Sequence, residues 1–483
     1  MLFNSIGYLF FLPVTVILYY AFPQRWRWML LLAASYLFYL TWRAEFVLVL
    51  MGATLVSYYA SLKMGQIPRK KERLKYLVMA LIVNLGMLVF FKYLGFLTDL
   101  FNEVAGMAGG RFTIPNLKIL LPIGISFYTF QTLGYTLDVY RGVIKPEKNI
   151  GIYALFVSFF PLVLAGPIER GRRLLPQLHF NHTFDPQLFA SGLRLILWGF
   201  FKKMVIADRL SMVVQPVFVE PRYFHGLEIG FAIILQMMQV YADFSGYTDI
   251  AIGSARLMGF KLSPNFNRPF TAQSIAAFWS RWHISLTSWL RDYVYFSLPY
   301  KFRGKTVAWR MNLNLLFTFV LVGFWHGPFW NFIIFGVLHG TFMILANISK
   351  PVMERFNRIS GLDRSPRVLK ALNITATFLL VCSTGFFFGQ HPLSDSFLMI
   401  KNLADFSHTG STVMELLRNN DLILGVALIF FMLWFEYLIA IRSFSSKFLG
   451  KPIAIRFAAY LFMLFFLLVF GIFSSQQFFY FQF

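Results

Sequence analysis

The chain has 483 residues, of which 58% are hydrophobic and only 13% are charged, and its mean hydropathy is +0.62. This composition lies outside the range of soluble globular proteins and predicts an all-α protein that crosses a membrane many times. A net charge of +23 is compatible with a nucleic acid or an acidic polymer as partner, but Lys and Arg also accumulate in the cytoplasmic loops of membrane proteins.

The positions of the basic residues favour topology as the cause of the charge. Three basic clusters separate apolar segments, and three other loops are acidic or mixed. We place the basic clusters in the cytoplasm and the other loops outside, and we expect no nucleic-acid partner. An additional attraction to anionic membrane lipid or to an acidic carrier protein remains open. The basic clusters are Lys63–Lys75, Lys350–Lys370 and Arg442–Arg456, and the outer loops are Asn102–Asn116, Val217–Glu228 and Gln390–Asp421.

The N-terminal segment, Met1–Ala21, lacks both a basic stretch and a small-residue cleavage site, so we expect it to be retained as the first span. At about 20 apolar residues per crossing, the chain is predicted to form about eleven transmembrane helices plus one or two re-entrant pieces. The regular segments are Met1–Ala21, Met29–Leu40, Phe46–Leu62, Tyr76–Leu100, Leu188–Val214, Leu227–Ala251, Ile275–Leu298, Met311–Phe324, Trp330–Ile348, Ala371–Phe388, Leu422–Ile441 and Ala454–Ile472.

Two apolar segments, Ile119–Val139 and Ile150–Leu164, are irregular. Pro122, Gly124 and Pro161 interrupt them, which predicts discontinuous or re-entrant helices. Non-helical backbone at membrane depth is tolerated only where it is buried in protein or lines a cavity. The middle of the chain is therefore expected to surround a central cavity.

No fixed-period repeat and no soluble module interrupts the pattern, so we expect one transmembrane domain over residues 1–483, with a catalytic core region at 121–327. The single cysteine, Cys382, excludes a disulfide framework and a thiolate metal site. No metal-ligand spacing of the zinc or EF-hand type occurs, so no metal is expected.

The segment around Asp243 carries many polar residues in an apolar helix. Such side chains are costly against lipid and should face the protein interior or a wet cavity. Asp243 and Asp249 are six positions apart, about 240° around a helix, and share a face only if the helix breaks at Gly246. We favour structural pairing of these carboxylates with Arg residues over an acid pair or an ion site. The polar residues are Gln236, Gln239, Tyr241, Asp243, Ser245, Tyr247 and Asp249, followed by Arg256, Asn265, Asn267 and Arg268.

A histidine, His326, lies in the bend Gly323–Pro328 between two apolar segments. An ionisable side chain at that depth is rare and is by default a functional candidate. His283, 43 residues earlier, would alone be interpreted as a hydrogen-bonded core histidine. Two intramembrane histidines on separate segments can instead act as a base and its orienting partner without a metal. His339 is expected only to pack or to form hydrogen bonds.

Several motifs in fixed order resemble the membrane-bound O-acyltransferase superfamily, over roughly residues 1–350. The length, the run GPIER and the terminal Phe-Gln-Phe are more similar to its alginate O-acetylation branch than to the shorter proteins of teichoic acid D-alanylation. The matching runs are LPIGISFYTFQ (121–131), DVYRG (138–142), GPIER (166–170), FKKMVIAD (201–208), DFSGYTDIAIG (243–253), FWSRWHISLTSWLRD (278–292) and GFWHG (323–327).

The resemblance implies acyl transfer across the bilayer of the bacterial inner membrane. A cytoplasmic acyl thioester, acetyl-CoA, would serve as co-substrate, with no bound cofactor. The acetyl group would leave on the outer side, onto a polysaccharide hydroxyl or onto an extracytoplasmic partner that resembles the SGNH hydrolases. Alginate, cellulose, another exopolysaccharide and peptidoglycan all remain open as final acceptors.

The family's hallmark histidine matches His326, and its second polar position matches His283. Imidazole is suited to take the proton of a hydroxyl near neutral pH, and burial should keep His326 neutral at rest. Donors to the tetrahedral oxyanion could be the His283 ring, Trp or Ser side chains, or backbone N–H groups of the bend. The expected substrate-binding residues are Trp325, Trp282, Arg281, Ser285, Asp243, Tyr247 and Gln239.

Other interpretations remain open. Arg281 and Trp282 could simply hold their segment at a membrane interface. The same fold could transfer D-alanine or act on peptidoglycan. A polysaccharide or lipid transporter would also have broken helices and charges near the midplane, but it would not need the paired histidines. A scaffold in an export complex would make them dispensable.

Overall fold

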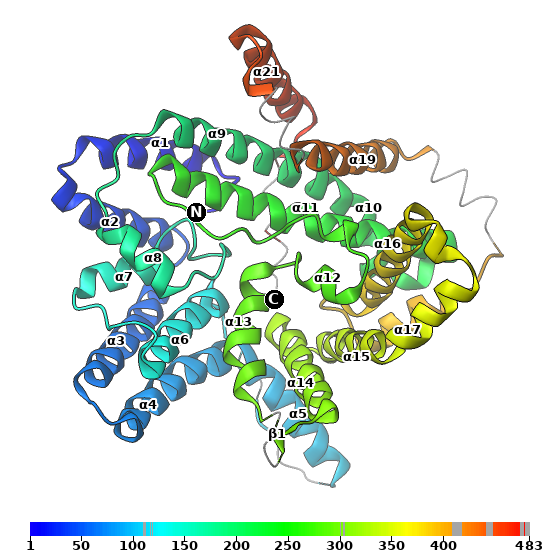
Figure 1. Cartoon of the computed structure of the whole chain (residues 1–483), viewed down its shortest axis with the longest axis horizontal. Coiled ribbons are helices and arrows are strands. Elements are labelled where there is room, and N and C mark those ends of the chain that lie inside the picture. Colours follow the sequence, from blue (N-terminus) through cyan, green and yellow to red (C-terminus); the bar gives the residue numbers. More distant parts are fainter. Residues whose placement is uncertain are drawn as a thin grey trace. The chain divides into compact units, whose positions relative to one another are not determined.

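The computed structural model (Figure 1) describes residues 1–109, 113–115, 117, 119–299, 301–302, 305–407, 418–440, 448–473 and 478. The regular secondary structure of this part is helical apart from one antiparallel pair of two-residue strands, β1 (Lys301–Phe302) and β2 (Lys305–Thr306). Seven of its helices are long and apolar enough to cross a membrane. The all-α, multi-pass class is thereby confirmed, while the count of about eleven spans stays a prediction.

Parts of several predicted segments lie outside the described residues. These are 110–112 and 116 of the first outer loop, 408–417 of the long outer loop, 441–447 of the last basic cluster and its preceding span, and 479–483 of the aromatic C-terminal end.

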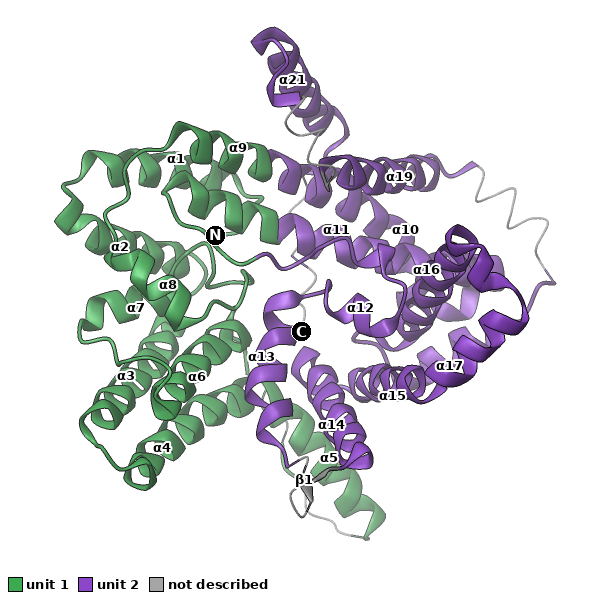
Figure 2. Cartoon of the chain, viewed as in Figure 1, with its two compact units in different colours: residues 1–196, 248–263 green, residues 197–247, 264–483 purple. Residues whose placement is uncertain are grey.

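The chain forms two compact units, residues 1–196 with 248–263, and residues 197–247 with 264–483 (Figure 2). Helices α9 and α11 continue from one unit into the other. The first unit contains α1 (Ile6–Ala21), η1 (Gln24–Trp26), α2 (Arg27–Leu40), α3 (Glu45–Gln66), α4 (Lys70–Leu88), η2 (Val89–Tyr93), α5 (Leu94–Met107), α6 (Ile125–Arg141), α7 (Ile150–Ser158), α8 (Gly171–His179) and most of α9 (Pro186–Phe200).

The second unit holds both candidate catalytic histidines. In chain order it contains η3 (Phe201–Ala207), α10 (Asp208–Val219), η4 (Pro221–Tyr223), most of α11 (Leu227–Leu257), η5 (Pro269–Thr271), α12 (Ile275–Trp279), α13 (Ile284–Tyr293), η6 (Tyr295–Ser297), the two strands, α14 (Ala308–His326), α15 (Trp330–Ile359), η7 (Leu362–Arg364), α16 (Pro366–Ser383), η8 (Thr384–Phe387), α17 (Leu393–Asn402), α19 (Asn420–Ala440) and α21 (Ile453–Phe470).

The predicted interruptions of the two irregular segments are confirmed in the first unit. Helix α6 begins only after Gly124, whose φ of +77° is in the left-handed region. A Cβ there would lie 2.0 Å from the carbonyl oxygen of Val163. Beyond α7, residues 159–169 are non-helical and buried, and the amide of Phe160 donates to Ser35 Oγ. The non-helical backbone is thus buried in protein, as it must be at membrane depth.

Two other expectations about helix continuity have different outcomes. The predicted span Ile275–Leu298 is wrong, because the chain there forms two short helices, α12 and α13, separated at 280–283. The longer of the two has 10 residues and rises about 15 Å, half of the hydrocarbon thickness. By contrast, α11 runs without a break through Gly246, so Asp243 and Asp249 do not share a face.

Contacts within each unit agree with the assignment of the loops to two sides. In the first unit, Tyr58 of α3 donates its hydroxyl proton to the Lys148 carbonyl, and Lys70 at the start of α4 lies over the Tyr140 ring near the end of α6 at 5.4 Å. The predicted basic cluster Lys63–Lys75 therefore adjoins the end of α6. In the second unit, the amide of Gly226 donates to the Asn402 carbonyl at 2.9 Å. Two loops predicted to lie outside therefore contact each other.

The assignment of sides can be tested with cysteine labelling. In a Cys382→Ala background, we expect Lys71→Cys and Ser365→Cys to be shielded from an impermeant thiol reagent in intact cells, and Ser407→Cys to react. All three positions are exposed on the chain itself, so all three should label after permeabilisation, which is the control. The opposite pattern in intact cells would reverse the orientation and the direction of transfer.

Candidate active site

The bend that carries His326 is held by a close contact between α14 and α15. A Cβ at Gly323 would lie 2.0 Å from the carbonyl oxygen of Phe332. Glycine at this position therefore lets the two backbones approach one another. The consequence is that His326, the last residue of α14, lies against the first turns of α15.

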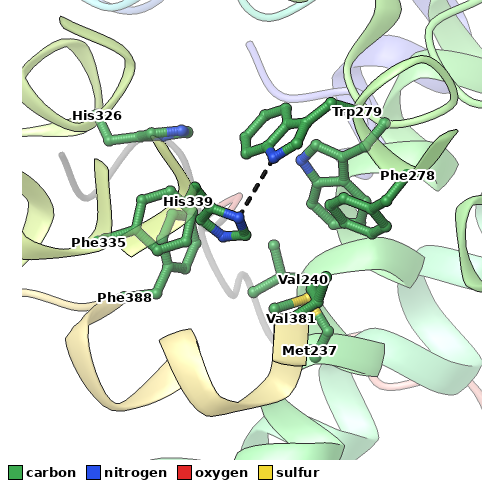
Figure 3. Close-up of a pocket in the computed structure, with 10 residues that line it drawn as sticks. Met237, Val240, Phe278, Trp279, His326, Phe335, His339, Val381 and Phe388 are labelled. Atoms are coloured by element: carbon green, nitrogen blue, oxygen red, sulfur yellow. Dashed lines mark hydrogen bonds between the residues drawn. The ribbon is translucent and has the colours of Figure 1, made fainter. Parts of the chain in front are cut away.

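His326 is 3% exposed and forms part of the wall of a small, partly open pocket. Figure 3 shows its imidazole pointing across this pocket toward the indole of Trp279. Helices α11, α12, α14, α15 and α16 all contribute to the walls. The residues that line the pocket are Met237, Val240, Phe278, Trp279, Trp282, His326, Phe335, His339, Val381 and Phe388.

Aromatic rings surround the imidazole of His326. The rings of Phe388 and Phe335 meet it edge-on, with centroids at 5.1 and 5.8 Å, and Phe332 stacks on it at 6.1 Å. Such an apolar environment strengthens electrostatic interactions with any reacting group that enters it.

His339 lies in the same pocket, within a directed chain of hydrogen bonds. Trp279 Nε1 donates to His339 Nδ1 at 3.3 Å (Figure 3), and His339 Nε2 lies 3.1 Å from Thr384 Oγ1. The Thr384 hydroxyl gives its proton to the Val381 carbonyl, so Nε2 of His339 must be the donor. Both nitrogens are therefore engaged in a neutral ring, so His339 packs and forms hydrogen bonds here, and the expectation that this is its only role stays a prediction.

The two candidate catalytic histidines contact the same indole. The Trp325 ring lies 5.1 Å from the His326 ring and 5.7 Å from the His283 ring, edge-on in both cases. His283 is 1% exposed and precedes α13, and its Nδ1 lies 3.1 Å from Oδ1 of Asn265. The structure thus brings His326, Trp325 and His283 together, although His283 does not line the pocket itself.

The other predicted binding residues lie at varied positions around this centre. Trp282 lines the pocket and stacks on Phe278, with ring centroids 5.4 Å apart. Ser285 donates its hydroxyl proton to Asn265 Oδ1 at 2.9 Å. The Arg281 guanidinium donates to Thr271 Oγ1 at 2.7 Å and is not part of the pocket wall.

Two predicted residues on α11 also lie outside the pocket wall. The Tyr247 ring stacks on Phe478 at 4.5 Å, and Gln239 is half-buried.

Asp243 belongs to a buried ion cluster rather than to the pocket wall. Lys203 Nζ lies 2.8 Å from Asp243 Oδ1 and 2.8 Å from Asp208 Oδ1, and all three residues are buried. The expected pairing of Asp243 with an arginine is therefore wrong in residue type, because the cation is the lysine of a π-helical turn, η3. Among the described residues, no three His, Cys, Asp or Glu side chains are grouped as metal ligands.

Most pocket residues were not predicted as site residues. Phe335, Met237 and Val240 are apolar positions on apolar helices, a pattern that equally predicts core packing. Val381 and Phe388 lie beyond the predicted catalytic core region at 121–327. Asn265 was expected to face the interior or a wet cavity, but its contact with His283, 18 residues later, was not predicted.

Comparison with known proteins agrees with these motifs. Residues 149–387 match the model of the membrane-bound O-acyltransferase family. The chain is 39% identical to the probable alginate O-acetylase AlgI of Pseudomonas aeruginosa over 84% of this chain and 75% of the relative. It is 30% identical to the peptidoglycan O-acetyltransferase of Helicobacter pylori over 87% of this chain and 84% of the relative.

A third relative is the teichoic acid D-alanyltransferase of Bacillus subtilis, which is 31% identical over 58% of this chain and 71% of the relative. All three names describe transfer of an acyl group. With its helical membrane fold, its motifs and this coverage, the chain belongs to the membrane-bound O-acyltransferase family and is an O-acyltransferase.

Proposed function

We propose that this enzyme transfers an acetyl group from a cytoplasmic acyl thioester, acetyl-CoA, across the bacterial inner membrane to a hydroxyl on the outer side. The observation that carries the proposal is the position of His326, a buried imidazole in the wall of an apolar pocket. Donor and acceptor are separated by about 30 Å of hydrocarbon, so they can react only where a passage brings both to one buried point. The pocket at His326 is the proposed narrowest point of that passage.

In the proposed reaction, His326 is the general base. It takes the proton of the acceptor hydroxyl as the oxygen attacks the thioester carbonyl carbon. The new C–O bond makes a tetrahedral oxyanion, whose collapse breaks the C–S bond. The leaving thiolate then takes the proton from the His326 imidazolium, so that the products are an acetyl ester, a free thiol and a neutral histidine. No bound cofactor takes part.

The pocket favours acetyl over D-alanyl as the transferred group. A D-alanyl ester carries an ammonium group, and burying it without a carboxylate or other acceptor is costly. None of the ten residues recorded in the pocket wall is acidic. The O-acetylating relatives also match more of this chain than the D-alanyltransferase does.

For the acceptor, we propose alginate-type O-acetylation of a polysaccharide. This proposal is based on the P. aeruginosa relative, which is 39% identical to this chain, whereas the peptidoglycan O-acetyltransferase is 30% identical. We further propose that an extracytoplasmic partner resembling the SGNH hydrolases receives or passes on the acetyl group. The basic cytoplasmic clusters would attract the anionic donor and anionic lipid.

The test is acyl transfer across sealed vesicles that contain the purified protein. Acetyl-labelled acetyl-CoA is added outside, and alginate oligosaccharide with the extracytoplasmic partner is enclosed in the lumen. We expect free CoA outside and labelled ester inside, and no reaction with a D-alanyl thioester. Intact labelled donor inside, without free CoA, would indicate transport in place of acyl transfer and would contradict the proposal.

A further inference from the structure

The turn that carries His283 is clamped by a neighbouring loop. The amide of Asn267 donates to the Arg281 carbonyl at 2.9 Å, and the amide of Ile284 donates to the Asn265 carbonyl at 2.9 Å. Between these two bonds, His283 has a φ of +42°. A residue other than glycine in this left-handed region is strained, and such strain is concentrated at functional sites.

The side chain of Asn265 completes the clamp, and its orientation can be assigned. Its Oδ1 lies 3.2 Å from the Ser285 amide nitrogen, 2.9 Å from Ser285 Oγ and 3.1 Å from His283 Nδ1. A backbone N–H can only donate, so the atom that faces it is the amide oxygen and not the nitrogen. An oxygen without a proton can only accept, and therefore His283 Nδ1 carries the proton.

We propose that Asn265 is the positioning residue of His283, and that it holds this imidazole as the Nδ1–H tautomer with Nε2 unprotonated. The inference rests on the proposed function, and on the expectation from the sequence that His283 orients the His326 base. It adds a role that the motifs do not contain. A neutral ring in this tautomer accepts a hydrogen bond through Nε2 and does not donate one there. The oxyanion donors are then the Trp or Ser side chains or the backbone of the bend.

The bonding of Asn265 itself supports a positioning role. Asn265 is 1% exposed, and its Nδ2 has no hydrogen-bond partner among the described residues. Buried polar groups normally satisfy both their donors and their acceptors. Here the amide oxygen accepts three contacts while the amide nitrogen has none. The side chain is therefore oriented by the donors that face its oxygen. Those atoms belong to His283 and the residue two positions after it.

The first test is spectroscopic and needs no turnover. In protein labelled with ¹⁵N and ¹³C at histidine, nitrogen–carbon correlation spectra at neutral pH identify which ring nitrogen lacks a proton. The His283 signal is assigned by its loss in His283→Gln. We expect an unprotonated nitrogen bonded to Cδ2, which is Nε2, in the wild type. In Asn265→Ala we expect a mixture of tautomers. An unprotonated nitrogen bonded to Cγ in the wild type would overturn the inference.

The second test is kinetic, in the vesicle assay. Asn265→Ala should lower kcat about a hundredfold, as expected for a misplaced catalytic group, with little change in KM. Asn265→Asp keeps the accepting oxygens and should recover at least about a tenth of the wild-type rate. Asn267→Ala is the matched control, because this exposed asparagine of the same loop uses only its backbone, and it should stay within about twofold of wild type.

The outcomes separate this inference from the proposed function. If the wild-type protein transfers acetyl and Asn265→Ala retains its kcat, the positioning role is contradicted. If the wild-type protein shows no transfer at all, the proposed function fails, and the tautomer measurement alone decides the inference. If Asn265→Ala fails to fold, the kcat of Asn265→Asp and the tautomer in the wild-type spectrum still test the positioning role.

Discussion

Replacing His326 with Ala is expected to abolish acetyl transfer while the protein remains folded. Removal of a general base costs about 10²–10⁴ in rate. The folded state should survive because the neighbours of the imidazole are mainly the aromatic rings of Phe332, Phe335 and Phe388, which keep their contacts with one another. The measurement is initial-rate transfer in vesicles, with thermal unfolding in detergent as the test of folding.

His326→Phe is the sharper variant of this experiment. A phenyl ring keeps the aromatic contacts around position 326 but has no nitrogen, so it should be as inactive as His326→Ala and closer to wild type in stability. Retention of more than about a tenth of the wild-type rate by either variant would contradict the assignment of the base. His283→Ala should lower the transfer rate by the same factor as His326→Ala or by a smaller one. If the double variant loses no more than the single ones, the two histidines act as one unit.

The candidate catalytic residues could be predicted from the sequence, because an ionisable side chain between apolar segments has few structural explanations. The interrupted backbone around Gly124 was predictable for a similar reason, since proline and glycine break helices. The pocket wall was not. Phe335 and Val381 have the same local pattern whether they face lipid, the core or a cavity, and only the packing of α11, α12, α15 and α16 decides between these.

Ion-pair and hydrogen-bond partners that are distant in sequence could not be predicted either. Asp243 was expected to pair with an arginine, but Lys203 on η3 supplies the positive charge at 2.8 Å. The motif FKKMVIAD, which contains Lys203, was visible in the sequence. The direction of the Lys203 side chain was not, because η3 is a π-helical turn, which shifts each later side chain around the helix axis. The segment from Ile275 to Leu298 was hydrophobic enough for a span, yet it breaks at the His283 turn, where hydrogen bonds to Asn265 replace helical ones.

The second large effect is expected at Lys203, and it concerns stability. Its ammonium group is 2.8 Å from carboxylate oxygens of both Asp208 and Asp243, and all three residues are buried. Lys203→Met has a similar length but no charge, so it would leave two buried carboxylates without this cation. Breaking a buried ion pair from one side costs about 3–5 kcal/mol. We therefore expect a clear fall in the thermal unfolding midpoint in detergent, and low yield from the membrane.

A compensated variant distinguishes the lost charge from lost packing. Lys203→Met combined with Asp208→Asn and Asp243→Asn removes all three of these charges, and replacing a buried ion cluster with neutral groups is often close to neutral in free energy. This triple variant should recover most of the stability that Lys203→Met loses. Lys370→Met, the same change at an exposed position, is the control and should shift stability by no more than about 0.5 kcal/mol. If the triple variant is as unstable as Lys203→Met, the side-chain contacts of Lys203, and not its charge, stabilise the packing of η3 against α11.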